Sequence, residues 1–429
     1  MTIKRIKRRR SGAFLAATLL AGGLVAGAAT AQDAGVQLTF GLSESLKSND
    51  NQALDVKSAG TTTSATTTLS FGLLSETATQ RLSLDMSADL RLANTPATKG
   101  TVTRVGDPAV TLAYSVDGAS AGLSTKAYYR KADVAFLRPL TDFVDAQGQI
   151  QLPTDLADLT GTGTRAEYGA NLTYDWGRDG PLGVSLSAGL AGLTYDNTTS
   201  PALFDNRRIT LAATAGYQIN PATRATTTLR FARFEASDAA GTNTTTSGLD
   251  LGLTRTLERG TASATLSADR SDAGTRLGFR LGRALDLPGG ALSASLGATR
   301  APDGLNGVTG SLSWQHALPT GQINAALTRG ITQTATATDQ LTTALSLGYT
   351  QQLGPTAALA LNLSYAVNDA GGAGASVTNR GLDATYSHAL TADWNLDAGY
   401  SYRSRDAGAG LANSNAVFLT LRRDFNLRP

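Results

Sequence analysis

The feature that most constrains this fold is a strict alternation of apolar and polar residues, which recurs along the whole chain. From Leu82 to Leu92 every even-numbered residue is apolar, whereas the odd-numbered residues from Arg81 to Arg91 are arginine, serine or aspartate. Residues 165–176 and 357–367 show the same alternation. Successive side chains of a β-strand point to opposite faces, so this period predicts strands with one apolar and one polar face. No helical period fits these segments.

The alternation predicts about twenty strands, each near the roughly 9 to 11 residues that a tilted membrane strand needs, plus an extension beyond the bilayer. The expected strands are 35–43, 65–74, 80–92, 107–116, 119–130, 163–176, 181–194, 205–219, 223–235, 245–257, 260–270, 274–287, 291–300, 306–318, 321–332, 339–353, 356–368, 377–390, 392–405 and 413–425.

The connections between these strands alternate in length. Every second one is a tight turn, such as Asp117-Gly118 or Gly354-Pro355. The intervening connections are mostly longer and rich in Gly, Asn, Asp and Thr, notably 44–64, 93–106, 131–162, 195–204 and 369–376. Short periplasmic turns and long external loops are typical of outer-membrane barrels, so we assign the tight turns to the periplasmic side.

The N-terminus differs in composition from the remainder. Six basic residues between Lys4 and Arg10 precede an apolar run from Ala13 to Gly27 and the small-residue triplet Ala29-Thr30-Ala31. This pattern predicts a cleavable signal peptide over residues 1–31. The alternative is an uncleaved anchor, but the run is shorter than the ~20 apolar residues that a spanning helix needs. Removing the segment leaves 31 basic and 34 acidic residues, so the basic pI of about 9.1 is no sign of nucleic-acid binding.

These observations predict an all-β fold, a transmembrane antiparallel up-and-down β-barrel of about 20 strands over residues 32–429. The chain has no cysteine, so an exported protein of this kind must be held together without disulfides. A closed, hydrogen-bonded barrel in lipid meets that need. A secreted propeller or β-solenoid is the alternative, but it requires a motif repeated in each blade or coil, and none is found.

Few residues are available for catalysis or metal binding. The two histidines, His316 and His388, each follow an expected outward aromatic, Trp314 or Tyr386, close to a periplasmic turn. That placement favours a role at the membrane interface over a barrel phospholipase or protease. The glycine-rich stretch near Gly371 lacks the helix and lysine of a phosphate loop. We therefore predict no catalytic, cofactor or metal site.

The inward face carries charges of both signs. The expected pore wall includes Arg165, Arg208, Arg224, Arg230, Arg276 and Arg280, and the same reading places Arg380 and Asp383 in the lumen. Two interpretations remain open. The charges either neutralise one another across neighbouring strands or select the ions that pass.

The connection 131–162 is too long for a simple hairpin and carries unusual apolar content, including Val134, Phe136 and Leu159. A solvated loop could not leave that surface exposed, so we expect it to fold into the barrel mouth as a constriction. Its aspartates would then face wall arginines such as Arg165, Arg208, Arg224 and Arg230. These aspartates are Asp133, Asp142, Asp145, Asp155 and Asp158. The alternative is an outward cap or a partner-binding surface.

The last predicted strand runs from Asn415 to Phe425 and resembles the C-terminal strand of outer-membrane proteins, which usually ends on Phe and is read by the assembly machinery. Here residues 426–429 follow the Phe. Over its mature length the chain resembles Gram-negative outer-membrane porins, and more closely the uncharacterised porin-like barrels of alphaproteobacteria. Porins typically fold a long third external loop into the barrel, and connection 131–162 holds that place. Common porins have fewer strands than twenty.

The resemblance implies a passive diffusion channel for small hydrophilic solutes, without cofactor or turnover. Its expected partners are outer-membrane lipid and lipopolysaccharide, the barrel-assembly machinery and the solutes. No plug segment is expected between Ala31 and Gly35, which argues against a TonB-dependent transporter. A structural or surface-interaction barrel that binds partners through loops 44–64 and 131–162 is the second hypothesis, and a barrel hydrolase the third.

Overall fold

The computed structural model describes residues 35–96, 101–134, 150, 155, 159, 162–200, 202–302, 306–333, 339–369, 376–408 and 410–427, so the predicted signal peptide lies outside them. These residues contain twenty strands. The strands are β1 (Gly35–Asn49), β2 (Thr62–Glu76), β3 (Gln80–Asn94), β4 (Thr101–Asp117), β5 (Ala121–Asp133), β6 (Thr164–Trp176), β7 (Leu182–Asp196), β8 (Asn206–Asn220), β9 (Thr223–Ala236), β10 (Asn243–Leu257), β11 (Gly260–Ser271), β12 (Gly274–Leu287), β13 (Gly290–Arg300), β14 (Asn306–Leu318), β15 (Gly321–Gln333), β16 (Asp339–Gln352), β17 (Ala357–Asp369), β18 (Val377–Ala389), β19 (Trp394–Asp406) and β20 (Leu411–Leu427).

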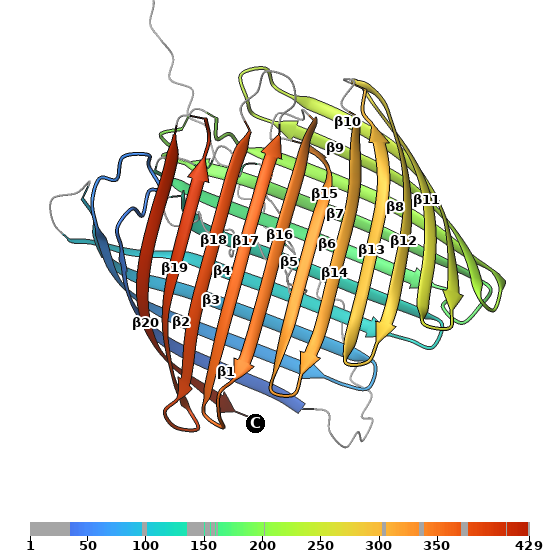
Figure 1. Ribbon diagram of the computed structural model, residues 1–429. Coiled ribbons are helices and arrows are strands. Elements are labelled where there is room, and N and C mark those ends of the chain that lie inside the picture. Colours follow the sequence, from blue (N-terminus) through green and yellow to red (C-terminus); the bar gives the residue numbers. More distant parts are fainter. Residues whose placement is uncertain are drawn as a thin grey trace, which may run out of the picture. The chain divides into compact units, whose positions relative to one another are not determined.

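The strands close into one antiparallel barrel (Figure 1). Each strand pairs with its neighbours in the sequence, and β1 pairs with both β2 and β20, so the sheet has no free edge. The predicted all-β barrel of about twenty strands is confirmed. Among the described residues, no helix is long and apolar enough to cross a membrane.

The two faces of the sheet follow from the period of two. Leu69, Leu266 and Leu296 belong to the outward face, and each is more than half exposed, as expected of side chains that meet lipid. On β17 the outward Leu361 pairs with Tyr349 and Ala384, whereas the adjacent Asn362 pairs with Gly348 and Asp383 on the inward face. Polar inward positions therefore stand directly beside apolar outward ones.

Several strands extend further than expected at their external ends. Residues 44–49 and 62–64 belong to β1 and β2, so the connection predicted over 44–64 shortens to 50–61. In the same way β3 and β4 extend into the connection predicted over 93–106. These stretches are mostly polar and lose the strict alternation, with apolar exceptions such as Leu46 and Val102, because a strand that projects beyond the bilayer has no need of an apolar side. Alternation alone therefore placed their ends too early.

The placement of Arg380 in the lumen is wrong. Arg380 pairs with Tyr365, in register with Leu363 and Leu382 on the outward face, and its guanidinium carbon lies 6.0 Å from the centroid of the Tyr365 ring. Asp383 pairs with Asn362 and faces inward. Residues separated by three positions in a regular strand cannot share a face.

One irregularity shifts the alternation within β4. The pairing of β3 with β4 slips between Ser87 and Asp89, and Asp107 adopts a φ of 52° at that point. Asp107 forms an ion pair with Arg91 on β3, with 2.7 Å between the Asp107 Oδ2 and the Arg91 Nη2. The bulge thus adds a residue to β4 without breaking the barrel.

The connection between β1 and β2 is fastened to β20. The Asn51 side chain donates to the carbonyls of Asp55 (2.7 Å) and Asn413 (2.8 Å). Asp50 accepts from the backbone and side-chain N–H groups of Asn415, both at 2.7 Å. This external loop therefore lies against the seam where the barrel closes.

Candidate functional site

The inward face of β9 to β15 surrounds a polar cavity of about 520 Å³. Arg230 donates to Asp250 on β10 (2.8 Å) and to Asp269 on β11 (2.9 Å), both on the inward face. Arg276 and Arg280 of β12 also line the cavity, together with threonines from four strands. A water-filled lumen requires polar and charged walls of this kind.

At the external mouth, buried residues of the connection between β5 and β6 join separate parts of the barrel wall. Leu159 packs in one buried cluster with Val134 at the end of β5, with Leu203 and with Ala366 of β17. The Leu159 carbonyl also accepts a hydrogen bond of 3.3 Å from Arg405 of β19. β5 and β17 lie far apart around the ring. We refer to Val134, Asp155 and Leu159 as the mouth bridge, because the contacts of these residues join distant walls inside the barrel.

A buried ion pair fixes the bridge to β6. Asp155 accepts from the Nε (2.8 Å) and Nη2 (3.3 Å) of Arg165, and both side chains are at least 97 % buried. The Tyr195 hydroxyl of β7 donates to the same carboxylate. Arg165 donates in addition to Glu167 at 2.8 Å. Two charges this deeply buried are held only where their hydrogen bonds are satisfied, and this arrangement satisfies them.

The chain enters β6 through Gly163. This glycine has a φ of 125°, and a Cβ at the position would lie 2.7 Å from the Cα of Thr198. Its carbonyl accepts a hydrogen bond of 3.0 Å from the Val134 N–H, which closes the base of the connection. Only glycine fits this close approach.

The other predicted wall residues have varied partners. The Arg208 guanidinium lies 5.1 Å from the centroid of the inward Phe234 ring. Arg224 lies over Gly216, where a Cβ would come within 2.4 Å of its Nη2. Arg276 pairs with Asp339 at the start of β16.

Among the predicted constriction residues, the structure brings Asp155 to Arg165. Asp133 pairs with Arg104 of β4. Asp142, Asp145 and Asp158 lie outside the described residues. Arg230 bonds to two aspartates of the wall itself, which is the cross-strand neutralisation that the sequence left open.

Four residues of the bridge region were not anticipated as site residues: Tyr195, Leu203, Ala366 and Arg405. Alternation assigns a residue to a face, but it carries no information on contacts made across the lumen. No signal in the sequence could have found Ala366 or Arg405.

Both histidines stack on the aromatic residue two positions before them. His316 lies 5.9 Å from Trp314 and His388 lies 6.2 Å from Tyr386, measured between ring centroids. Within the described part of the chain, no group of His, Cys, Asp and Glu side chains could hold a metal ion.

Comparison with known proteins supports the fold. Over 92% of this chain and 81% of the other, the barrel superposes on the siderophore receptor PirA of Pseudomonas aeruginosa, with a TM-score of 0.51 and 10% identity. The ferric enterobactin receptor PfeA of the same organism (R480A_Q482A mutant) gives a TM-score of 0.50 and 12% identity over 91% and 81% of the two chains. The chain has the outer-membrane β-barrel fold.

A third solved structure, the outer membrane protein OpdK of Pseudomonas aeruginosa, gives a lower TM-score of 0.41 at 10% identity over 91% and 99% of the chains. No family model matches the sequence, and no curated protein does. The finer resemblance to alphaproteobacterial barrels therefore has no support from relatives.

Proposed function

We propose that this protein is an outer-membrane channel through which small hydrophilic solutes diffuse passively. The observation that carries the proposal is the polar cavity lined by Arg230, Asp250 and Asp269 inside a closed barrel whose outward face is apolar. A barrel of this strand number is wide enough to leave a passage unless other parts of the chain fill it.

The proposal includes the mouth bridge as the constriction of that channel. Leu159 contacts walls on two sides of the mouth, which supports a segment that narrows the passage over one that caps it from outside. Of the five expected constriction aspartates, Asp155 lies in the mouth bridge and Asp133 ends β5, whereas the placement of Asp142, Asp145 and Asp158 stays a prediction. Asp155 fastens the segment through its ion pair, and solutes pass along the cavity beside β9 to β15.

Arg280 is the wall residue best placed to act on passing ions. It lines the cavity next to the Arg230 cluster. The Arg230 guanidinium is engaged by Asp250 and Asp269, so these three side chains carry a net charge of −1, and Arg280 brings this part of the wall close to neutral. We expect weak ion selectivity from this part of the wall.

Reconstitution tests the channel directly. The purified chain, lacking residues 1–31, should give discrete current steps in planar bilayers and should let small sugars, but not large dextrans, enter liposomes. Heat-modifiable electrophoretic mobility provides a control for correct folding. A folded protein that gives neither current nor solute entry would overturn the proposal.

Location belongs to the same proposal. Cleavage after Ala31 should leave a mature N-terminus near Gln32, in a protein that fractionates with the outer membrane. N-terminal sequencing of the fractionated protein checks both points. Recovery of the intact chain in the inner membrane would contradict them.

Assembly of the barrel supplies a further partner. β20 ends the described chain, pairs with β1 and carries Phe425 opposite Phe40. We propose that this strand is what the barrel-assembly machinery recognises. Phe425→Ala should lower the folded yield in cells more than it lowers the folded yield after refolding into detergent. Equal losses of the two yields would contradict recognition of this residue by the machinery.

The second candidate is a surface-interaction barrel without transport. The observation in its favour is the ordered connection 50–61, held against β20 by Asn51 and Asp50. A folded barrel that conducts nothing, yet loses cell-surface attachment when residues 52–59 are deleted, would support this candidate instead.

A further inference from the structure

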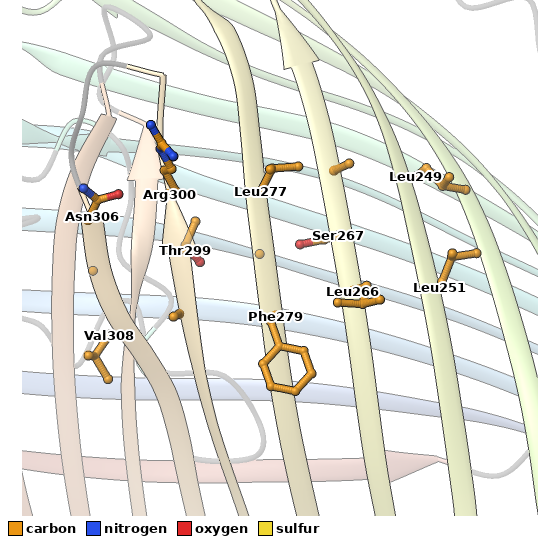
Figure 2. A pocket seen from close by; sticks show the side chains of 14 residues that line it. Leu249, Leu251, Leu266, Ser267, Leu277, Phe279, Thr299, Arg300, Asn306 and Val308 are labelled. Carbon is orange, nitrogen blue, oxygen red and sulfur yellow. The ribbon is translucent and has the colours of Figure 1, made fainter.

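The outward face of the barrel is hollowed over β10 to β14 by a groove of about 760 Å³ (Figure 2). Large apolar side chains form its sides, and the small outward residues Ala268 and Ala298 lie among them. The large lining residues are Leu249, Leu251, Leu266, Leu277, Phe279 and Val308. Such a hollow accepts a hydrocarbon chain better than a flat strand surface does.

Two arginines stand at the external end of this groove. Arg300 is the last residue of β13, pairs with Leu277 and Asn306, and lines the groove with both. Figure 2 shows Arg300 and Asn306 together at one end, with Phe279 and Val308 further along the strands. Arg270 occupies the corresponding outward position near the end of β11 and pairs with Thr275.

Neither guanidinium is neutralised by a residue that the structure describes. Arg270 and Arg300 are exposed, and neither forms an ion pair or hydrogen bond with any other residue that the structure describes. Arg207 and Arg233, on β8 and β9, differ because both pair with Glu235. One strand separates β11 from β13, and the partners of the two arginines on β12, Thr275 and Leu277, are two positions apart. The Cα atoms of the two arginines are therefore about 12 Å apart.

The arrangement is that of a site for an amphiphile with an anionic head. Guanidinium groups bind phosphate through paired, charge-assisted hydrogen bonds. If Arg270 and Arg300 hold the phosphate of a lipid, the acyl chains of that lipid lie along the leucines of the groove. The charge complements a phosphorylated lipid, and the groove complements its tails.

We propose that Arg270, Arg300 and this groove bind a phosphorylated glycolipid of the outer leaflet, namely the lipid A part of lipopolysaccharide. The external position of both arginines follows from the strand directions, because β11 and β13 end on the same side as β1 and β5, which precede the long connections 50–61 and 134–163. The connection after β11 is itself short, at residues 272–273. The inference rests on the outer-membrane location given above, but not on channel activity.

The test compares two forms of one probe. Delipidated protein in detergent is titrated with purified bisphosphorylated lipid A and with the same lipid after removal of its phosphates. Wild type should bind the phosphorylated form at least about tenfold more tightly. In Arg270→Ala/Arg300→Ala that preference should disappear.

Two further variants complete the design. Arg255→Ala/Arg259→Ala, at the periplasmic end of β10 and its turn, removes two exposed arginines from the other rim and should keep the preference. Ala298→Trp fills the groove and should weaken binding of both lipids. Heat-modifiable mobility confirms that each variant is folded.

Several outcomes would overturn the site. Wild type without a phosphate preference, a preference that survives in Arg270→Ala/Arg300→Ala, or one that disappears equally in the periplasmic variant would each do so. Because binding is measured on isolated protein, a channel that fails to conduct would leave this result intact, and a lost preference would leave the channel intact.

Discussion

Arg165 and Arg230 are both inward-facing arginines that pair with aspartate, yet their surroundings differ. The side chain of Arg165 is 3% exposed and that of Arg230 is 41% exposed. Arg165 meets Asp155 of the mouth bridge, whereas Arg230 meets aspartates of β10 and β11. The strand pattern is the same in both places. A segment that enters the barrel turns one position into a buried structural contact and leaves the other facing the cavity.

The largest expected difference concerns stability. Asp155→Ala strips a buried guanidinium of its main partner and should lower the free energy of unfolding by about 3 to 5 kcal/mol. Asp250→Ala leaves Arg230 with Asp269 and with water, so its cost should stay below about 1 kcal/mol. Denaturant unfolding of both variants in one detergent measures the two free energies of unfolding. Equal losses would show that the two pairs do not differ in burial.

A second pair of variants tests which strand residues face the lipid and which face the lumen. Leu84→Arg and Leu361→Arg put a charge on the lipid side and should each cost roughly 2 to 4 kcal/mol if they lie near the midplane. The adjacent inward variants Ser83→Arg and Asn362→Arg should be tolerated far better. Refolding into lipid vesicles measures each pair. Similar damage within a pair would show that the register is wrong.

A smaller effect is expected on ion selectivity. Arg230→Gln frees two carboxylates beside the cavity, so the ratio of cation to anion permeability should rise, on the order of twofold at low salt and less at high salt. Reversal potentials across a salt gradient give the ratio. Arg233→Gln, on the outward face of the same strand, is the matched control. A ratio that moves equally in both variants would separate Arg230 from the permeation path.

Much of the fold could be predicted because membrane strands repeat one simple pattern. The alternation from Leu82 to Leu92 is enforced by lipid on one side and water on the other, and it holds wherever a strand crosses the bilayer. It fails beyond the bilayer, as at residues 44–49, because neither face must be apolar there. Arg380 departs from the expectation that it faces the lumen, because its position two residues before Leu382 puts it on the outward face.

The candidate site was only partly predictable. The apolar content of residues 131–162 indicated burial, and Val134 and Leu159 are indeed buried. Which wall they would meet depends on the closed ring, since Ala366 and Arg405 follow them by some two hundred residues in the sequence. A pattern with a period of two carries no information about such distant contacts.

The central claim is that residues 131–162 narrow the passage, and deletion of 138–158 tests it most directly. Single-channel recordings should show a larger conductance and weaker ion selectivity than wild type, while deletion of 239–241 in the short external connection between β9 and β10 should change neither. Heat-modifiable mobility establishes that both variants are folded. A folded 138–158 deletion with the conductance of wild type would place the segment outside the permeation path and contradict the account.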